Sequence, residues 1–154
     1  MDLYFAIAAT AAFIELVFLL HAISNLHYTS IKYNKPRLRY RPKAIVIIPC
    51  KGLDTDFENN IESFFRLDYE GYRLYFVVED ESDPAFAALN EIKERISAES
   101  NAGEVKILVA GKTSGCSQKI HNLLYGCRQI TEDVEIIAFA DSDICVRPNW
   151  LAGR

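Results

Sequence analysis

An apolar segment near the N-terminus limits most strongly what this chain can fold into. It runs from Leu3 to Ile23 and reads LYFAIAATAAFIELVFLLHAI. As an α-helix, these 21 residues are about 31 Å long, which is enough to cross the apolar core of a bilayer. Glu15 and His21 are its ionisable residues. A central charge costs about 2.5–3.5 kcal/mol on insertion scales. The neighbouring apolar side chains can offset that cost, and Glu15 can also insert in its protonated form or face another helix. We therefore predict a transmembrane helix.

Three other interpretations of this segment fit the sequence less well. A cleaved signal peptide has a basic start, whereas Asp2 precedes this long run. A buried core helix would need more chain around it, and an interfacial helix would have a polar face, which is missing here. Six basic residues follow the segment and none precedes it: Lys32, Lys35, Arg37, Arg39, Arg41 and Lys43. The positive-inside rule then places the remaining chain in the cytoplasm, as a single-pass membrane protein. The cluster can also contact anionic headgroups.

The chain beyond this basic cluster is acidic. From Ala44 onward it has 11 basic and 19 acidic residues, so we expect no binding to nucleic acid through a general positive field. The cysteines are Cys50, Cys116, Cys127 and Cys145, and none lies in a C-x-x-C pair. We interpret them as reduced thiols of a cytosolic domain that act as small buried apolar residues.

Strand and helix patterns alternate from Ala44 to the end of the sequence. The predicted strands are 44–49, 74–78, 105–110 and 135–140, and their short apolar runs suit a sheet that is buried on both faces. Between them lie three predicted helices. Their expected inward residues are Phe57, Ile61, Phe64 and Phe65, then Ala85, Leu89, Ile92 and Ile96, then Ile120, Leu123, Leu124 and Cys127. Asp54 or Thr55 would cap the first helix and Asp83 the second, and another helix would start near Asn149. This order predicts an α/β fold with a mostly parallel sheet, preceded by one transmembrane helix.

Polar residues follow each predicted strand at its carboxyl end. They are Cys50-Lys51-Gly52, Glu79-Asp80, Gly111-Lys112 and Asp141-Ser142-Asp143. Parallel sheets bind ligands at this edge. Asp141 and Asp143 would lie on one side of an extended segment and share Mg²⁺ or Mn²⁺, although Asp and Ser also favour simple turns. Asp80 can either accept a hydrogen bond from a nucleotide or cap a helix. Lys119 lies at a helix start, where it can either bind phosphate or be a solvated surface residue.

These residues form an ordered set of short motifs that resembles glycosyltransferase families 2 and 21, of the ceramide glucosyltransferase type with its bacterial relatives. The motifs are Pro49-Cys50-Lys51-Gly52, Asn60 to Phe65 with Leu67-Asp68-Tyr69, Glu79-Asp80 with Asp83-Pro84-Ala85, Lys119 to Leu123, and Asp141 to Ile144 with Val146 and Pro148. Each motif is weak alone, but the set covers roughly residues 44–151 in order. An N-terminal membrane anchor also fits the resemblance.

The resemblance implies a Rossmann-like GT-A nucleotide-binding half and transfer of a sugar from a nucleotide sugar, expected to be UDP-linked, to a lipid such as ceramide. By position, Pro49 to Gly52 resembles the first nucleotide-binding loop, and Asp80 and Lys119 resemble nucleotide contacts. Asp141 resembles the aspartate of the metal motif, with Asp143 as its partner. The expected organisation is an anchor at 1–25, a basic linker at 26–43 and an incomplete GT-A domain at 44–154.

One departure from the family pattern affects the expected activity. The third aspartate, which the resemblance implies is the catalytic base, and the downstream Gln/Arg-x-x-Arg-Trp segment are not found before Arg154. We therefore expect the base beyond Arg154, and we expect the chain to be a fragment that binds a donor but does not turn over. Two alternatives stay open: a non-catalytic nucleotide-sugar-binding module and a nucleotidyltransferase. The latter would need more basic residues near the first loop than Lys51 alone.

Overall fold

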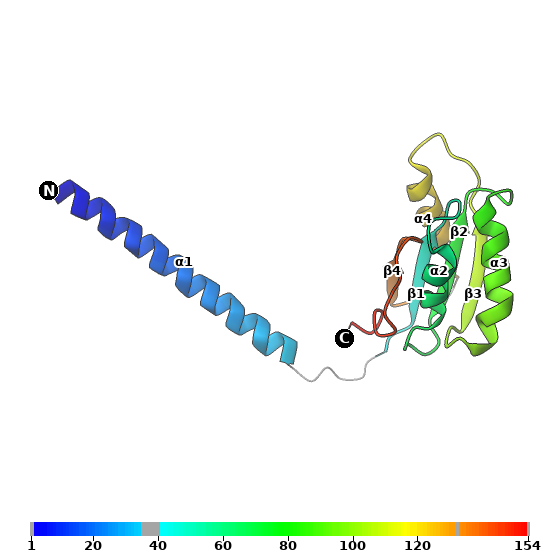
Figure 1. Cartoon of the computed structure of the whole chain (residues 1–154), viewed down its shortest axis with the longest axis horizontal. Helices are drawn as coiled ribbons and strands as arrows, with labels where there is room; N and C mark the ends of the chain where they lie inside the picture. The colour runs from blue at the N-terminus through cyan, green and yellow to red at the C-terminus, as the bar shows by residue number, and fades with distance from the viewer. Residues whose placement is uncertain (1, 35–40, 132, 154) are drawn as a thin grey trace. The chain divides into compact units, whose positions relative to one another are not determined.

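The structure is a computed structural model that describes residues 2–34, 41–131 and 133–153. It divides into two compact units, residues 1–40 and 41–154, and each is considered by itself. The first unit is one long helix, α1 (Asp2–Asn34), which continues past Ile23 (Figure 1). Within the described part of the chain, the segment Leu3–Lys32 alone is long and apolar enough to cross a membrane, and an 18-residue stretch of it has a mean hydropathy of 2.2. Basic positions 35, 37 and 39 of the expected linker lie outside the described residues.

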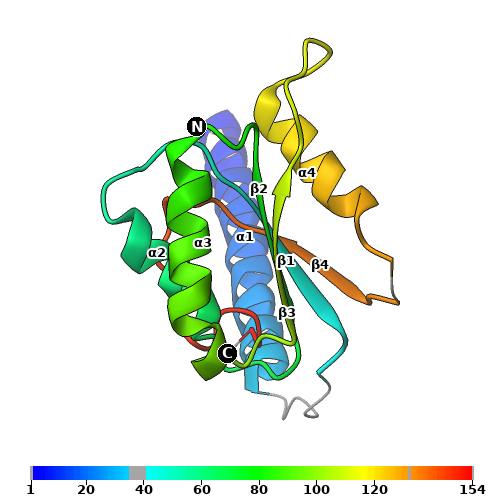
Figure 2. The ribbon, with the colours of Figure 1, turned by 90° about the vertical axis from the view of Figure 1, so that its right-hand side faces the viewer.

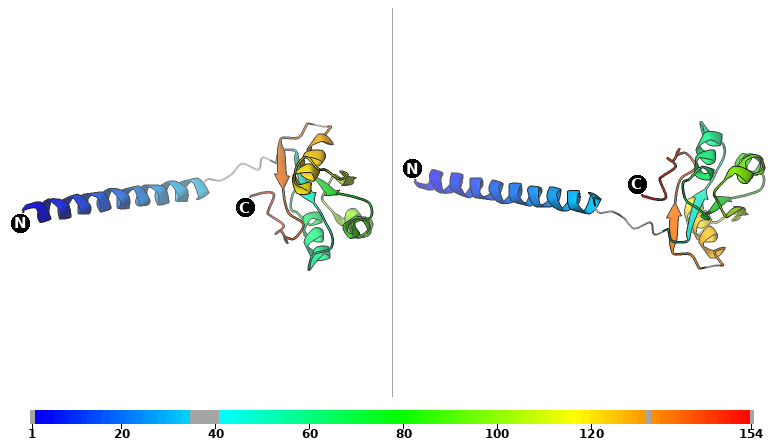
Figure 3. Two further views of the ribbon diagram at one scale, coloured as in Figure 1. Left: turned by 90° about the horizontal axis from the view of Figure 1, so that it is seen from above. Right: turned by 90° about the horizontal axis from the view of Figure 1, so that it is seen from below.

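The second unit is built on a four-stranded parallel sheet, as the sequence predicts. Its strands are β1 (Ala44–Pro49), β2 (Arg73–Val78), β3 (Glu104–Val109) and β4 (Ile136–Phe139), in the order β3-β2-β1-β4. Val46 of β1 pairs with Leu74 on one side and with Ala138 on the other. Figure 3 shows β4 beside β1 at one edge of the sheet. The chain moves from β1 outward to β3 and then returns past β1 to form β4.

The central strands are buried because side chains pack against both of their faces. Successive residues of a strand point to opposite faces. Val46 and Ile48 of β1 therefore belong to one apolar cluster, and Ile45 and Ile47 belong to the other. All four are fully buried, with 0% of their surface exposed. This explains why the run 44–49 is continuously apolar rather than alternating. The expected burial on both faces is wrong for the edge strand β4, where three of the four residues are exposed.

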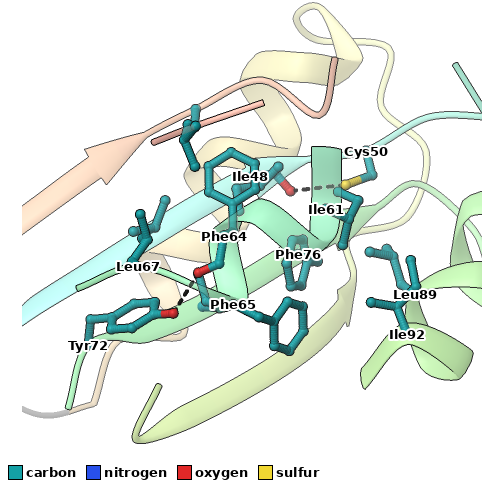
Figure 4. Close-up of a cluster of buried hydrophobic side chains, with 14 of the residues drawn as sticks. Ile48, Cys50, Ile61, Phe64, Phe65, Leu67, Tyr72, Phe76, Leu89 and Ile92 are labelled. Carbon is teal, nitrogen blue, oxygen red and sulfur yellow. Dashed lines mark hydrogen bonds between the residues drawn. The ribbon is translucent and has the colours of Figure 1, made fainter. Parts of the chain in front are cut away.

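Helices α2 (Phe57–Phe65) and α3 (Pro84–Ile96) cover one face of the sheet (Figure 2). A short 3₁₀ turn, η1 (Ser97–Glu99), follows α3. Figure 4 shows the core beneath these helices, where the rings of Phe65 and Phe76 stack with centroids 5.8 Å apart. The hydroxyl of Tyr72 donates a hydrogen bond to the carbonyl oxygen of Phe64 at 2.5 Å. This bond satisfies a polar group that the core encloses.

Helix α4 (Gln118–Arg128) covers the other face, and the inward face that we predicted for it is partly wrong. Ile120 and Leu124 are each 48% exposed, whereas Asn122 and Gly126 are buried. A Cβ atom added at Gly126 would lie 2.7 Å from Cγ2 of Ile47. The helix therefore approaches the sheet along a glycine and an asparagine, which an apolar periodicity does not reveal.

The predicted cap of α3 is confirmed, and the predicted cap of α2 is wrong. The carboxylate of Asp83 accepts a hydrogen bond from the N–H of Ala85 at 2.9 Å, which confirms it as the cap of α3. The predicted cap of α2 at Asp54 or Thr55 is wrong. Asp56 takes that position with a left-handed φ of 61°, and its side chain makes no capping bond. Residues 148–153 form turns rather than the helix expected near Asn149.

All four cysteines lie in the described residues and are free thiols. Cys50 is buried and Cys127 is half-buried, but Cys116 and Cys145 are exposed. The interpretation of all four as buried apolar residues is therefore wrong for Cys116 and Cys145. Both lie in irregular segments that connect elements, where side chains are normally accessible.

Candidate active site

A cavity of about 230 Å³ lies at the carboxyl edge of the sheet. Its lining comes from the ends of β1 and β2, from the first turns of α4 and from the segment after β4: Pro49, Cys50, Lys51, Asp54, Glu79, Gln118, Lys119, Asn122, Asp141, Ser142 and Asp143. The strand order reverses between β1 and β4, so the cavity lies at the switch point where open parallel sheets bind ligands. The structure thus brings together most of the site residues predicted from sequence.

Pro49, Cys50 and Lys51 of the first loop line the cavity, whereas the predicted site residue Gly52 is not part of the lining. The N–H of Cys50 donates to the carbonyl oxygen of Val77 at 2.9 Å, which ties the loop to β2. Burial is the main cause that raises the pKa of the Cys50 thiol, and the charges of Asp83 and Asp54 raise it further. Burial and the two carboxylates therefore favour the neutral thiol at Cys50. The side chain of Lys51 is 77% exposed, and its Nζ lies 3.8 Å from Oε2 of Glu79.

The segment after β4 places the two predicted metal ligands on the cavity. Ser142 and Asp143 form a turn rather than an extended continuation of the strand. Both Asp141 and Asp143 nevertheless line the cavity. The Nζ of Lys119 lies 2.6 Å from Oδ1 of Asp141, with the side chains 56% and 52% exposed. The lysine of α4 and the aspartate after β4 thus form an ion pair.

Asp80 is placed differently from its neighbour Glu79. Glu79 lines the cavity, whereas Asp80 is not part of the lining. The carboxylate of Asp80 accepts a hydrogen bond from the N–H of Ser82 at 2.9 Å. This backbone bond is the main cause that lowers the pKa of Asp80 below its ordinary value, with the hydroxyl of Ser82 and the charge of Lys112 as further causes. Asp80 is therefore ionised at neutral pH.

Sequence reasoning missed two polar residues of α4, Gln118 and Asn122. The side-chain nitrogen of Gln118 donates to the carbonyl oxygen of Gly111 at 2.7 Å and to Oδ1 of Asn122 at 2.8 Å. The amide of Asn122 donates to the carbonyl oxygen of Val77 at 3.3 Å. The two residues are four apart, so they share one helix face. That spacing is the signal that could have found them.

Asp141 and Asp143 fit a divalent cation whose remaining ligands are phosphate and water. Oxygen ligands suit Mg²⁺ and Mn²⁺, and Mg²⁺ is usually held by one or two carboxylates, with phosphates and water completing its shell. Asp141 and Asp143 supply that number on one cavity wall. No group of three or more His, Cys, Asp or Glu residues that could hold a metal occurs among the described residues.

Comparison with known proteins identifies the family. The sequence model of glycosyl transferase family 21 matches residues 4–153. The chain belongs to glycosyl transferase family 21. This confirms the resemblance drawn from the short motifs, and it decides against the nucleotidyltransferase alternative.

Two curated relatives of this family 21 chain come from Caenorhabditis elegans. The chain is 28% identical to ceramide glucosyltransferase 3 over 129 residues, which are 79% of the chain and 27% of that relative. It is 29% identical to ceramide glucosyltransferase 1 over 143 residues, which are 90% of the chain and 29% of that relative. The chain therefore spans less than a third of the length of the relatives it matches.

Solved structures share the fold of this family 21 chain. A mannosyltransferase of Pyrobaculum calidifontis, in complex with GDP-Man and Mn²⁺, is 19% identical with a TM-score of 0.57, over 86% of the chain and 41% of that protein. Residues 1–349 of TarS from S. aureus, in complex with UDP-GlcNAc, are 18% identical with a TM-score of 0.51, over 71% of the chain and 29% of that protein. These similarities confirm the predicted α/β fold of the GT-A type.

Proposed function

We propose that this chain forms the donor-binding half of a membrane-anchored glycosyltransferase, which transfers a sugar from a nucleotide sugar to a lipid. The observation that best supports the proposal is one cavity that combines the first loop, Lys119, Asp141 and Asp143 in a family 21 chain. Its volume of about 230 Å³ is below the usual 300–1,000 Å³ of complete ligand sites. We therefore expect it to hold the nucleotide diphosphate part of the donor.

The charges around the cavity support a role for Lys119 and Asp141 in holding that diphosphate. Lys119 lies in the first turn of α4, where helix N–H groups and a lysine favour anionic phosphate. Its ammonium, now paired with Asp141, can turn to a phosphate oxygen. Asp141 and Asp143 would hold Mg²⁺ or Mn²⁺. The bound cation would neutralise the negative charge that develops on the leaving diphosphate.

The proposal also includes a lipid acceptor and a membrane anchor. The named relatives are ceramide glucosyltransferases, which supports a lipid acceptor such as ceramide. The helix α1 has the length and the composition of a membrane span. With Lys32 in the last turn of α1 and Arg41 and Lys43 after the helix, we propose a single-pass anchor and a cytoplasmic catalytic domain. This location would keep the donor site near lipid acceptors.

Transfer itself is proposed for the whole protein. In an inverting reaction, a base deprotonates the acceptor hydroxyl as the sugar leaves the diphosphate. We do not assign that base to any of the described carboxylates. A non-catalytic binding module would share the same donor site, and turnover of the full-length protein distinguishes the two functions.

Calorimetry of the detergent-solubilised chain tests donor binding. Titrations with UDP and with GDP, each with and without Mn²⁺, separate the two donor types that the structural neighbours bind. We expect UDP to bind in the presence of Mn²⁺, and GDP to bind more weakly. If neither nucleotide binds under any condition, the donor-site proposal is wrong. If GDP binds more tightly than UDP, the donor is a GDP-sugar rather than a UDP-sugar.

A further inference from the structure

Asp83 has a second contact beyond its role as a helix cap. Its Oδ1 accepts the N–H of Ala85 in the first turn of α3 at 2.9 Å. The same oxygen accepts the N–H of Gly52 at 2.8 Å. Gly52 lies 31 residues earlier in the sequence, in the first loop of the cavity. One carboxylate oxygen thus joins the start of α3 to that loop.

The first loop is held at two points with Lys51 between them. The N–H of Cys50 donates to Val77 of β2, and the N–H of Gly52 donates to Asp83. Gly52 has a left-handed φ of 65°, which a glycine adopts without strain. Pro49, Cys50 and Lys51 line the cavity, whereas Asp83 itself is not part of the lining. Asp83 therefore contacts the loop that lines the cavity without lining the cavity itself.

We propose that Asp83 is a positioning residue for the donor, which fixes the loop from Pro49 to Gly52 in its binding conformation. This inference rests on the proposed function. Without the hydrogen bond from Gly52, one fewer hydrogen bond holds the loop in place. The loop would then have to become ordered when the donor binds, and the free-energy cost of that ordering would weaken binding. A preformed loop avoids that ordering cost. Because Asp83 occupies the N–H of Gly52, that N–H is not a phosphate donor in this conformation.

Three substitutions separate the two contacts of Asp83. Asp83→Asn keeps a side-chain oxygen for both N–H groups. Asp83→Ser keeps a good helix cap, but its shorter side chain loses the reach to Gly52. Asp83→Ala removes both contacts. UDP affinity in the presence of Mn²⁺ is measured by calorimetry on the full 154-residue chain. Thermal unfolding of each variant reports the helix cap.

We expect Asp83→Asn to bind UDP like the unchanged chain and Asp83→Ser to bind it about fivefold more weakly, the effect of one hydrogen bond. The melting temperature of Asp83→Ser should stay close to that of the unchanged chain. Equal UDP affinity in Asp83→Ser and the unchanged chain would overturn the proposal. If the unchanged chain binds no UDP at all, the proposed function fails instead.

Amide exchange in the unchanged chain gives a second measurement that does not depend on how variants fold. The N–H of Gly52 should be protected from exchange without UDP, and it should stay protected when UDP binds. Loss of that protection on UDP binding would mean that the loop leaves Asp83 to bind the donor. That result would also overturn the proposal.

Discussion

The Nζ of Lys119 lies 2.6 Å from Oδ1 of Asp141, so a residue proposed to bind phosphate neutralises a residue proposed to bind metal. The pair joins the start of α4 to the segment after β4. A cation that binds Asp141 must compete with the ammonium of Lys119. A bound diphosphate would offer that ammonium another partner. Metal and nucleotide should therefore favour each other's binding.

This competition predicts that Lys119→Met binds Mn²⁺ more tightly than the unchanged chain when no nucleotide is present. Because both side chains are about half exposed, the pair is weak, and we expect an effect of about two- to fivefold. Electron paramagnetic resonance of free Mn²⁺ measures the affinity. Lys93→Met, on α3 outside the cavity lining, is the control and should have no effect. Unchanged Mn²⁺ affinity in Lys119→Met would contradict the competition.

Asp80 and Glu79 offer two candidates for nucleotide recognition, and a pair of substitutions distinguishes them. We expect Asp80→Asn to weaken UDP binding by roughly tenfold or more, since a charged hydrogen bond is lost. The asparagine oxygen can still accept the N–H of Ser82, so folding should be nearly unchanged. Glu81→Gln, exposed and outside the cavity lining, is the control.

The opposite result would assign nucleotide recognition to Glu79, which lines the cavity. If Asp80→Asn binds UDP normally and Glu79→Gln does not, Glu79 recognises the nucleotide. If Asp80→Asn unfolds, Asp80 is a structural residue of the turn before α3.

Gly126 should be important for stability, because α4 approaches the sheet at this position. In Gly126→Ala, the new methyl group would lie 2.7 Å from Cγ2 of Ile47 and 3.2 Å from Cγ2 of Val77. Both are β-branched strand residues that cannot easily move. We expect the free energy of unfolding to fall by about 1–3 kcal/mol, despite the better helix propensity of alanine.

Urea unfolding followed by fluorescence measures this change. Trp150 is the only tryptophan, and its ring packs edge-on against Phe64 with centroids 6.1 Å apart. Gly115→Ala is the control, since its added carbon would have no neighbour nearer than 4.0 Å. A Gly126→Ala variant as stable as the unchanged chain would show that α4 can move away from the sheet at low cost.

The orientation of the proposed anchor predicts which vesicles protect the C-terminal domain. In sealed inside-out vesicles, protease should digest residues after the basic stretch, because the positive-inside rule places them on the cytoplasmic side. In right-side-out vesicles the same residues should be protected. Protection in the inside-out vesicles would contradict the orientation.

The sequence predicts the sheet well because β1 and β2 are buried on both faces, so that their runs are continuously apolar. The apolar periodicity does not predict the inward face of α4. Gly126 lies against Ile47 of the sheet, and the buried Asn122 is hydrogen-bonded to Val77 and Gln118. Neither residue type signals a core position. The carboxyl edge of a parallel sheet predicts that Asp141, Lys119 and the first loop meet in space. It does not predict which of Glu79 and Asp80 faces the cavity, since that depends on the turn at Ser82.

The most direct test of the donor site is the effect of Mn²⁺ on UDP binding in the unchanged chain and in Asp141→Ala. We predict that Mn²⁺ tightens UDP binding to the unchanged chain and to Glu91→Ala, an exposed control on α3. The effect should be much smaller in Asp141→Ala, because Asp143 is then the one remaining proposed carboxylate ligand. If Mn²⁺ tightens UDP binding equally in Asp141→Ala, the cavity between β1 and β4 does not hold the metal-bound donor.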